Sequence, residues 1–595
     1  MINASSKKIS VFIFPMVLSM ILLICIAYSF TKYSKTYILP VIPVCITLTL
    51  MWLFVFIFHQ RKLNSQTSTI SINGYNYISI PLMIFLALYY TQTVWGSGYL
   101  SLHPFESLNS GTAHIDTLFH SSIAEACKNN FPAKYLTNEE NLIQYHYLSH
   151  VLMAIVSKLT TLPAFFTYNY LFPLILIPLY GLSQLLALSS VKKHISNIDT
   201  INQIDICLLF VTNIGLFSKA FNNRYAIWPG SFLISESFIT ANTLLFFCIY
   251  FIFSRLNSNT KKSKRILYFS IAIFITIISF SKISVGYIFT ISVIYYIFAK
   301  YPKSLKHWTI NLIYGLTFLI CYLLTTERNE FGTNSISISN FSLFAFANNF
   351  ISGRFGYAGH VFIITLPAIL LVIYALCKRQ LTVQNFRSRQ TVLLELSLII
   401  CIGGITPGAL LDISGSSMAY FSYSILFPIT FILCGYCSDH ICTKINKYIL
   451  MLEIAFLALM IIKSKSQLIP SLYSLDPIQT SDFYDEVSAI NSQIPKNRDN
   501  YCIFIGDDAS IFDFVSDGRS IPFYYAALTG IPVINASYNE NSNYYAIGGS
   551  ETTEYGLGFT SHSKLDLSTA IDIAKRQNKT AIIYIDNDGF TIIKL

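Results

Sequence analysis

The feature that most constrains this sequence is a series of long apolar runs separated by short loops. Such runs fill residues 9–30, 38–58 and 77–95, and they recur between residues 166 and 463. About 20 consecutive apolar residues are enough for a helix to cross a bilayer. Because 53% of the 595 residues are hydrophobic and only 12% are charged, a soluble globular fold is excluded. The pattern indicates a polytopic membrane protein.

The basic residues alternate between loops in the manner of such a protein. Lysine and arginine collect in every second loop, which is typical of loops that stay in the cytoplasm. The alternation predicts about 13 spans, with the N-terminus inside and the C-terminus outside. It also explains the net charge of +10, so nucleic-acid binding is not expected. The later spans are expected near 166–188, 205–220, 238–254, 267–281, 284–299, 308–324, 360–377, 391–406, 420–437 and 448–463.

After about residue 465 the composition changes to that of a soluble domain. Short strand patterns appear at 500–506, 531–537 and 580–586, with helical patterns between them. The predicted fold class is therefore an all-α membrane bundle with a small C-terminal α/β domain. The expected domains are a transmembrane domain at 1–465, with an outer catalytic loop at 96–145, and a periplasmic α/β domain at 466–595.

Residues 103–150 form the only long polar segment in the first 320 positions, and they hold five of the eleven histidines. Ionisable groups at a membrane are costly to keep without a use, so this stretch is the predicted active-site loop. Asp116 and His120 are four residues apart in a helical pattern and would share one face. A carboxylate oriented by a histidine can remove a proton from an attacking hydroxyl. Alternatively, Asp116 caps an interfacial helix and His120 anchors it.

His146 and His150 form a second pair with helical spacing, on a run at 145–159 that is too short to span. Such a pair can hold a metal, can bind a substrate or lipid phosphate, or can pack at the interface. The sequence leaves these three interpretations open.

Three cations are candidates for binding a phosphate. Lys282 lies between two close-set spans, with Gly286 one turn further on, where glycine allows a ligand or a neighbouring helix to approach. Arg224 and Arg354 lie in other loops on the expected outer face. For Lys282 the alternative is a lysine that merely extends to the membrane surface.

The pattern D-x-x-x-H-x-x-x-A-x-x-x-x-x-x-F-P from Asp116 to Pro132, followed by YHYLSHVLMA at 145–154, resembles loop elements of the GT-C superfamily of integral-membrane glycosyltransferases. The resemblance implies a donor sugar linked to polyprenyl phosphate, with Asp116 as general base on the acceptor hydroxyl and inversion at the anomeric carbon. Many members carry a paired acid where this chain has Ile115, Asp116 and Thr117. The single carboxylate favours a reaction with no metal and no other cofactor, and a divalent metal is the minor alternative.

The sequence thus predicts a hexosyl- or pentosyltransferase of the bacterial inner membrane. It would move a sugar from a polyprenyl-phosphate donor to an envelope glycan or glycolipid acceptor on the periplasmic face. Its expected partners are that donor, the acceptor and membrane lipids. Two alternatives are an O-antigen-type polysaccharide polymerase or ligase, and a transporter or flippase of lipid-linked saccharides. A transporter would need ionisable groups deep within its spans, where the sequence shows almost none.

Overall fold

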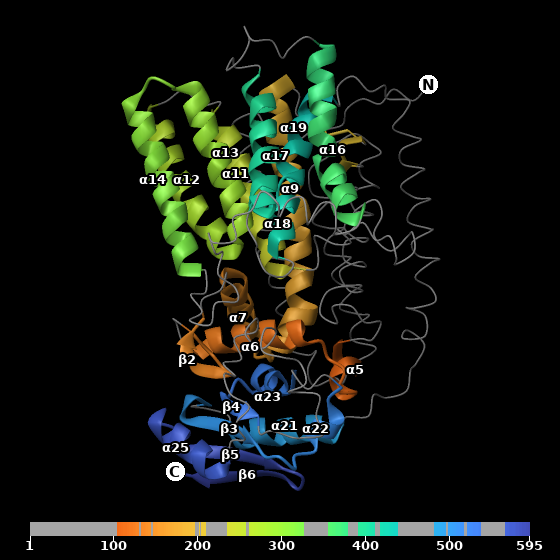
Figure 1. The fold of residues 1–595 in the computed structure, drawn as a ribbon, viewed down its shortest axis with the longest axis vertical. Helices are drawn as coiled ribbons and strands as arrows, with labels where there is room; N and C mark the ends of the chain where they lie inside the picture. Colours follow the sequence, from red (N-terminus) through yellow and green to blue (C-terminus); the bar gives the residue numbers. More distant parts are fainter. Residues whose placement is uncertain are drawn as a thin grey trace, which may run out of the picture. The chain divides into compact units, whose positions relative to one another are not determined.

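The structure is a computed structural model (Figure 1). It describes residues 104–129, 133–143, 147–196, 201–202, 204–206, 208–209, 235–256, 261–325, 355–378, 391–410, 417–437, 481–494, 498–516, 520–536 and 566–595. The chain forms two compact units, and the division falls between Leu174 and Ile175. We call the described residues from Ile175 to Cys437 the helical unit, and those at 104–174 and 481–595 the α/β unit.

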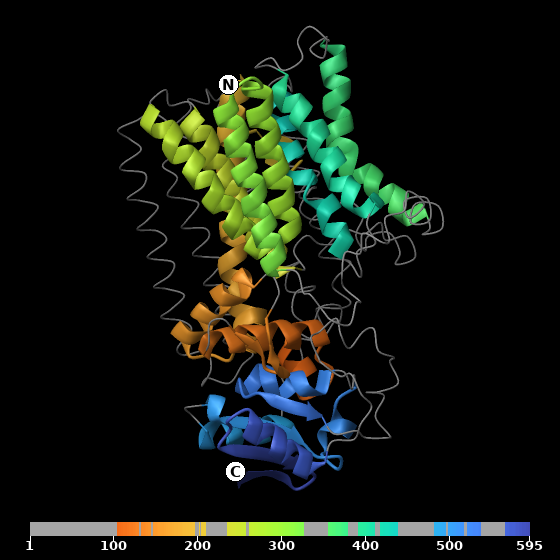
Figure 2. The ribbon, with the colours of Figure 1, turned by 60° about the vertical axis from the view of Figure 1, so that its left-hand side comes forward.

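The helical unit consists of long apolar helices, which Figures 1 and 2 show packed side by side. Three of the described helices, namely α11, α13 and α14, are long and apolar enough to cross a membrane. They coincide with predicted spans, which supports a multi-pass membrane protein. The total of about 13 stays a prediction, because the expected spans at 9–95 and 448–463, and most of the span at 205–220, lie outside the described residues. The helices are α9 (Phe172–Ser196), α11 (Glu236–Leu256), α12 (Lys261–Ser281), α13 (Ile283–Lys300), α14 (Leu305–Thr325), α16 (Phe355–Cys377), α17 (Val392–Leu410), α18 (Ser417–Tyr423) and α19 (Leu426–Cys437).

The predicted span at 420–437 differs from the structure, which has two helices there. Helix α18 ends at Tyr423 and α19 begins at Leu426. Proline has no backbone N–H, and its ring clashes with the carbonyl four residues earlier in a helix. Pro428 cannot donate to the Ser424 carbonyl, and a two-residue turn at Ser424 and Ile425 separates the two helices.

The α/β unit combines two distant parts of the sequence. Its sheet has the strand order β4-β3-β5-β6, in which β3 is parallel to β4 and β5, and β6 is antiparallel to β5. These strands confirm the three predicted strand positions. The first part provides α5 (Pro104–Asn109), α6 (Ile115–Asn129), β1 (Lys134–Tyr135), β2 (Asn138–Leu142), α7 (Leu148–Thr160), α8 (Ala164–Phe166) and the π-helical turn η1 (Thr167–Leu171). The second provides α21 (Asp482–Gln493), η6 (Arg498–Asn500), β3 (Tyr501–Ile505), α22 (Ile511–Phe514), α23 (Ile521–Thr529), β4 (Val533–Ala536), α25 (Leu567–Arg576), β5 (Ala581–Asp586) and β6 (Gly589–Lys594).

One apolar core joins the two parts of the α/β unit. It includes Ile115, Leu118 and Phe119 from α6, and Phe523 and Tyr524 from α23. The rings of Phe119 and Phe523 meet edge to face, with their centroids 5.7 Å apart. The predicted domain ranges place the polar loop with residues 1–465, whereas its core is shared with the C-terminal segment.

Candidate functional site

Helix α6 carries the predicted base and has the expected amphipathic pattern. Ile115, Leu118, Phe119 and Ile123 are buried in the shared core. Asp116 lies in the first turn, and its side chain is 39% exposed. The N-terminus of a helix stabilises a negative charge, because its backbone N–H groups point toward it. The first turn of α6 therefore presents the carboxylate at a position that a substrate can reach.

His114 is the neighbour of this carboxylate. Its Nδ1 atom accepts the backbone N–H of Asp116 at 3.2 Å and lies 3.7 Å from the carboxylate Oδ2 atom. His114 is not among the predicted site residues, although its position two residues before Asp116 could have indicated a contact with that carboxylate.

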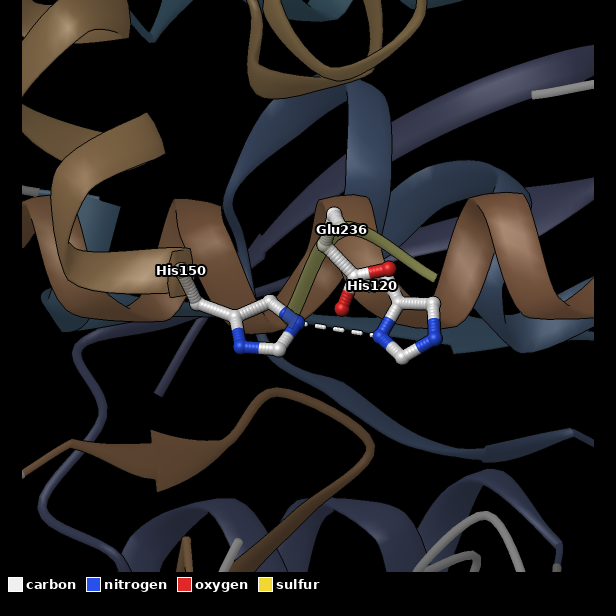
Figure 3. Close-up of side chains that lie close together, drawn as sticks. All are labelled: His120, His150 and Glu236. Atoms are coloured by element: carbon white, nitrogen blue, oxygen red, sulfur yellow. Dashed lines mark hydrogen bonds between the residues drawn. The ribbon is translucent and has the colours of Figure 1, made fainter. Parts of the chain in front are cut away.

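His120 and His150 are brought together, which the sequence could not show. His120 Nδ1 lies 2.9 Å from His150 Nε2 in a hydrogen bond, and the two rings lie side by side with their centroids 5.1 Å apart (Figure 3). His150 is fully buried. Two imidazoles can pass a proton between them, or can supply two of the three protein ligands of a catalytic zinc site. The predicted pairing partner of His150, His146, lies outside the described residues.

The π-helical turn η1 completes the surroundings of His120. Tyr168 from this turn stacks on the His120 ring, with the centroids 5.9 Å apart. Within the described part of the chain, the buried Thr167 hydroxyl and the Asn169 side-chain oxygen have no hydrogen-bond partner. Buried polar atoms are nearly always paired, and single π-turns occur frequently at functional sites.

The cysteine on α6 is not a nucleophile. Burial raises the pKa of the Cys127 thiol to about 12, so the thiolate is scarce at neutral pH. Asp116 and His120 therefore stay the candidate catalytic residues on this helix.

Replacement of His150 by phenylalanine tests the histidine pair. The variant keeps the ring volume but leaves His120 Nδ1 without its partner, which should destabilise the α/β unit by about 1–3 kcal/mol. Faster hydrogen exchange in α6 and α7 would report this loss. The control is Ser149→Ala, because the Ser149 hydroxyl is 3.5 Å from His150 Nδ1 and contributes little. Equal exchange in both variants would contradict a stabilising pair.

In the helical unit, Lys282 lies at the turn between α12 and α13. It has an extended backbone and is only 7% exposed. Its ammonium lies 4.0 Å from the ring centroid of Tyr420, and the carboxylate of Glu236 attracts it electrostatically. Glu236, which Figure 3 also labels, is the first residue of α11 and is 1% exposed. Lys282 is thus a buried, paired cation rather than one that extends to the membrane surface.

Gly286 allows the two helices around Lys282 to come close. A Cβ atom at this position would lie 2.8 Å from Ser279 Cα, which real side chains do not tolerate. Among the described residues, the buried hydroxyls of Ser279 and Ser284 have no hydrogen-bond partner. A cation and two unfilled hydroxyls within one turn are suited to an anionic ligand such as a phosphate.

Sequence reasoning did not select Glu236 or Tyr420 as site residues. Glu236 could have been selected because it is an acidic residue directly before an apolar run. A carboxylate that becomes buried there needs a charged partner. The candidate phosphate ligands Arg224 and Arg354 lie outside the described residues, so their roles stay predictions.

No family model matches the chain, and no curated protein matches it. A solved structure that is similar to it is the archaeal oligosaccharyltransferase AglB from Archaeoglobus fulgidus, in complex with an inhibitory peptide and a dolichol-phosphate. The two are 11% identical over 86% of this chain and 70% of that one, with a TM-score of 0.37. A score of this size does not establish a shared fold, so the resemblance to the GT-C superfamily stays a prediction.

Proposed function

We propose that this protein is a membrane glycosyltransferase that takes a sugar from a polyprenyl-phosphate donor. The observation that supports this best is the Asp116 carboxylate, accessible at the first turn of a helix that is otherwise buried against a C-terminal α/β fold. A single accessible carboxylate on a fixed helix in a multi-pass membrane protein suits a general base for an acceptor hydroxyl. Envelope glycan or glycolipid is the proposed acceptor, and the outer face of a bacterial inner membrane is the proposed location.

In the proposed reaction, Asp116 takes the proton of the acceptor hydroxyl. The acceptor oxygen then forms a bond to the anomeric carbon, while the bond from that carbon to the phosphate oxygen breaks. The electron pair of the broken bond leaves with the polyprenyl phosphate. Lys282 is the proposed partner of this phosphate, whose negative charge increases as it leaves. A single displacement inverts the anomeric configuration, and the proposal needs no metal.

The C-terminal segment positions the proposed base. The backbone N–H of Ala113 donates to the Tyr524 hydroxyl at 2.9 Å. The Gly111 carbonyl accepts from the backbone N–H of Ser516 at 2.9 Å and from its hydroxyl at 3.1 Å. These bonds fix the residues immediately before Asp116. We therefore assign the C-terminal segment the role of holding the first turn of α6 in place.

A transporter of lipid-linked saccharides is the second candidate, and one observation favours it. Lys192 and Asp205 form an ion pair at 2.6 Å in the helical unit, and both side chains are fully buried. The sequence showed almost no ionisable groups deep in the spans, but buried charges are what a transport pathway requires. Lys192 lies in the last turns of α9, however, where a structural pair would suffice.

Product formation separates the two candidates. Membranes that contain the protein, supplied with radiolabelled polyprenyl-phosphate sugar, should form labelled glycan that membranes without the protein do not form. A chelator should leave the rate unchanged. If the label crosses the membrane while still attached to its lipid, the protein is a transporter and the proposed function is wrong.

Replacement of Lys282 by methionine tests the proposed phosphate contact. Methionine keeps the apolar stem and removes the charge, so the KM for the lipid-linked donor should rise about 10- to 100-fold, as expected for a charge-assisted contact. The KM for the acceptor should stay the same. The control is Lys306→Met, because Lys306 is an exposed lysine in the first turn of α14. An equal rise in both KM values would indicate general damage instead of a lost phosphate contact.

A further inference from the structure

An apolar cavity of about 270 Å³ lies within the helical unit. Its walls come from α9, α11, α12, α13, α17 and α19. Along α13 the lining residues run from Ile288 to Lys300, which is roughly 18 Å of helix axis at about 1.5 Å per residue. The cavity therefore follows the direction of the helices from their middle to one end.

That end of the cavity is basic. Arg255 in the last turn of α11 and Lys300 in the last turn of α13 both line the cavity, and both are exposed. Tyr301, which also lines it, stacks on His307 with the ring centroids 3.9 Å apart. Cations and tyrosines at helix ends are typical of the headgroup level of a membrane. The cavity thus leads from a cationic opening at that level into an apolar interior.

We propose that this cavity binds one acyl chain of an anionic phospholipid, whose phosphate is bound by Arg255 and Lys300. A guanidinium and an ammonium are both good phosphate partners, and the apolar walls suit hydrocarbon. The site is separate from Lys282, which lies at the opposite end of α13. The inference therefore does not depend on the proposed function.

Other occupants fit less well. A buried water needs two to four polar partners, whereas the Ser292 hydroxyl on the cavity wall already donates to the Ile288 carbonyl at 2.6 Å. A partner helix is about 10 Å across, which a cavity of about 270 Å³ cannot admit. An empty cavity would cost the dispersion contacts of every wall residue. A single acyl chain restores those contacts, and the phosphate of the same lipid brings negative charge to the basic end.

Photolabelling with a defined lipid tests the site. The full-length protein is reconstituted in phosphatidylcholine vesicles that contain a small fraction of photoactivatable phosphatidylglycerol. We expect labelled peptides from the cavity-lining parts of α11 and α13. Ser292→Phe should fill the cavity and lower this labelling at least about tenfold. The double variant Arg255→Ala with Lys300→Ala removes both charges without filling the cavity, and it should lower the labelling about fivefold for each charge.

Two matched controls lie outside the cavity. Leu312→Phe enlarges a side chain that is 63% exposed on α14, and Lys303→Ala removes an exposed charge after α13. Both should label like the unchanged protein. Equal labelling by a photoactivatable phosphatidylcholine, or labelling that neither the filled nor the double variant reduces, would overturn the proposal. Stronger competition by polyprenyl phosphate than by phosphatidylglycerol would overturn the assignment to a phospholipid.

Discussion

Asp116→Asn should lower glycan transfer by about 10²- to 10⁴-fold, which is the contribution of a positioned general base. The amide has the shape of the carboxylate but cannot accept the acceptor proton. Because the side chain is 39% exposed and packs in no core cluster, the variant should fold normally. The effect should appear in kcat, since the proton moves in the transition state. Initial rates at saturating donor and acceptor measure it.

Two further variants sharpen this result. Asp116→Glu keeps a carboxylate but moves it by one methylene, and it should retain more activity than Asp116→Asn. Asp572→Asn removes an exposed carboxylate from α25 and should have no effect. If Asp116→Asn transfers sugar at the normal rate, the proposed base is wrong, whatever the effect of Asp116→Glu.

Gly111→Ala should disrupt the first turn of α6 and lower transfer more than tenfold without changing a proposed catalytic group. Gly111 has a φ of +67°, and an added Cβ would overlap the Phe514 carbonyl oxygen and lie 3.2 Å from Val515 Cα. Backbone atoms cannot move aside as a flexible side chain can. We expect a loss of about 3 kcal/mol or more in the stability of this turn. Hydrogen exchange of the α6 amides should increase accordingly.

Substitutions at two other glycines distinguish steric overlap from backbone strain as the cause of this effect. Gly589 also has a positive φ, of +117°, but no atom lies within 4 Å of an added Cβ, so Gly589→Ala adds backbone strain alone. Gly315, within α14, has free space and no positive φ, so Gly315→Ala adds neither. Neither variant should change exchange in α6. Unchanged exchange in Gly111→Ala would mean that the C-terminal segment does not hold the proposed base.

Local patterns in the sequence predicted much of the structure. The spacing of Ile115, Leu118, Phe119 and Ile123 predicted the amphipathic helix α6, and short apolar runs predicted the buried strands β3, β4 and β5. Both signals depend on neighbours within one element. They carry no information about which element lies against which, so the contact of Ala113 with Tyr524, 411 positions later, could not be predicted.

The candidate site shows the same limit. The four-residue spacing suggested Asp116 and His120 as partners, but the hydrogen bond of His120 goes to His150 on another helix. Lys282 could be selected as a cation near the membrane surface, but its burial beneath Tyr420 depends on a helix more than 130 positions away in the chain.

The most direct test of the proposed function is the fate of the donor lipid with the purified protein in vesicles. A lipid-linked sugar labelled in its lipid and an acceptor are supplied, and free polyprenyl phosphate and the anomeric configuration of the product are measured together. We predict that polyprenyl phosphate appears in equal amount to the transferred sugar, with inverted configuration, and that Asp116→Asn abolishes both. Recovery of the lipid-linked sugar intact, or equal release by Asp116→Asn, would contradict the proposed function.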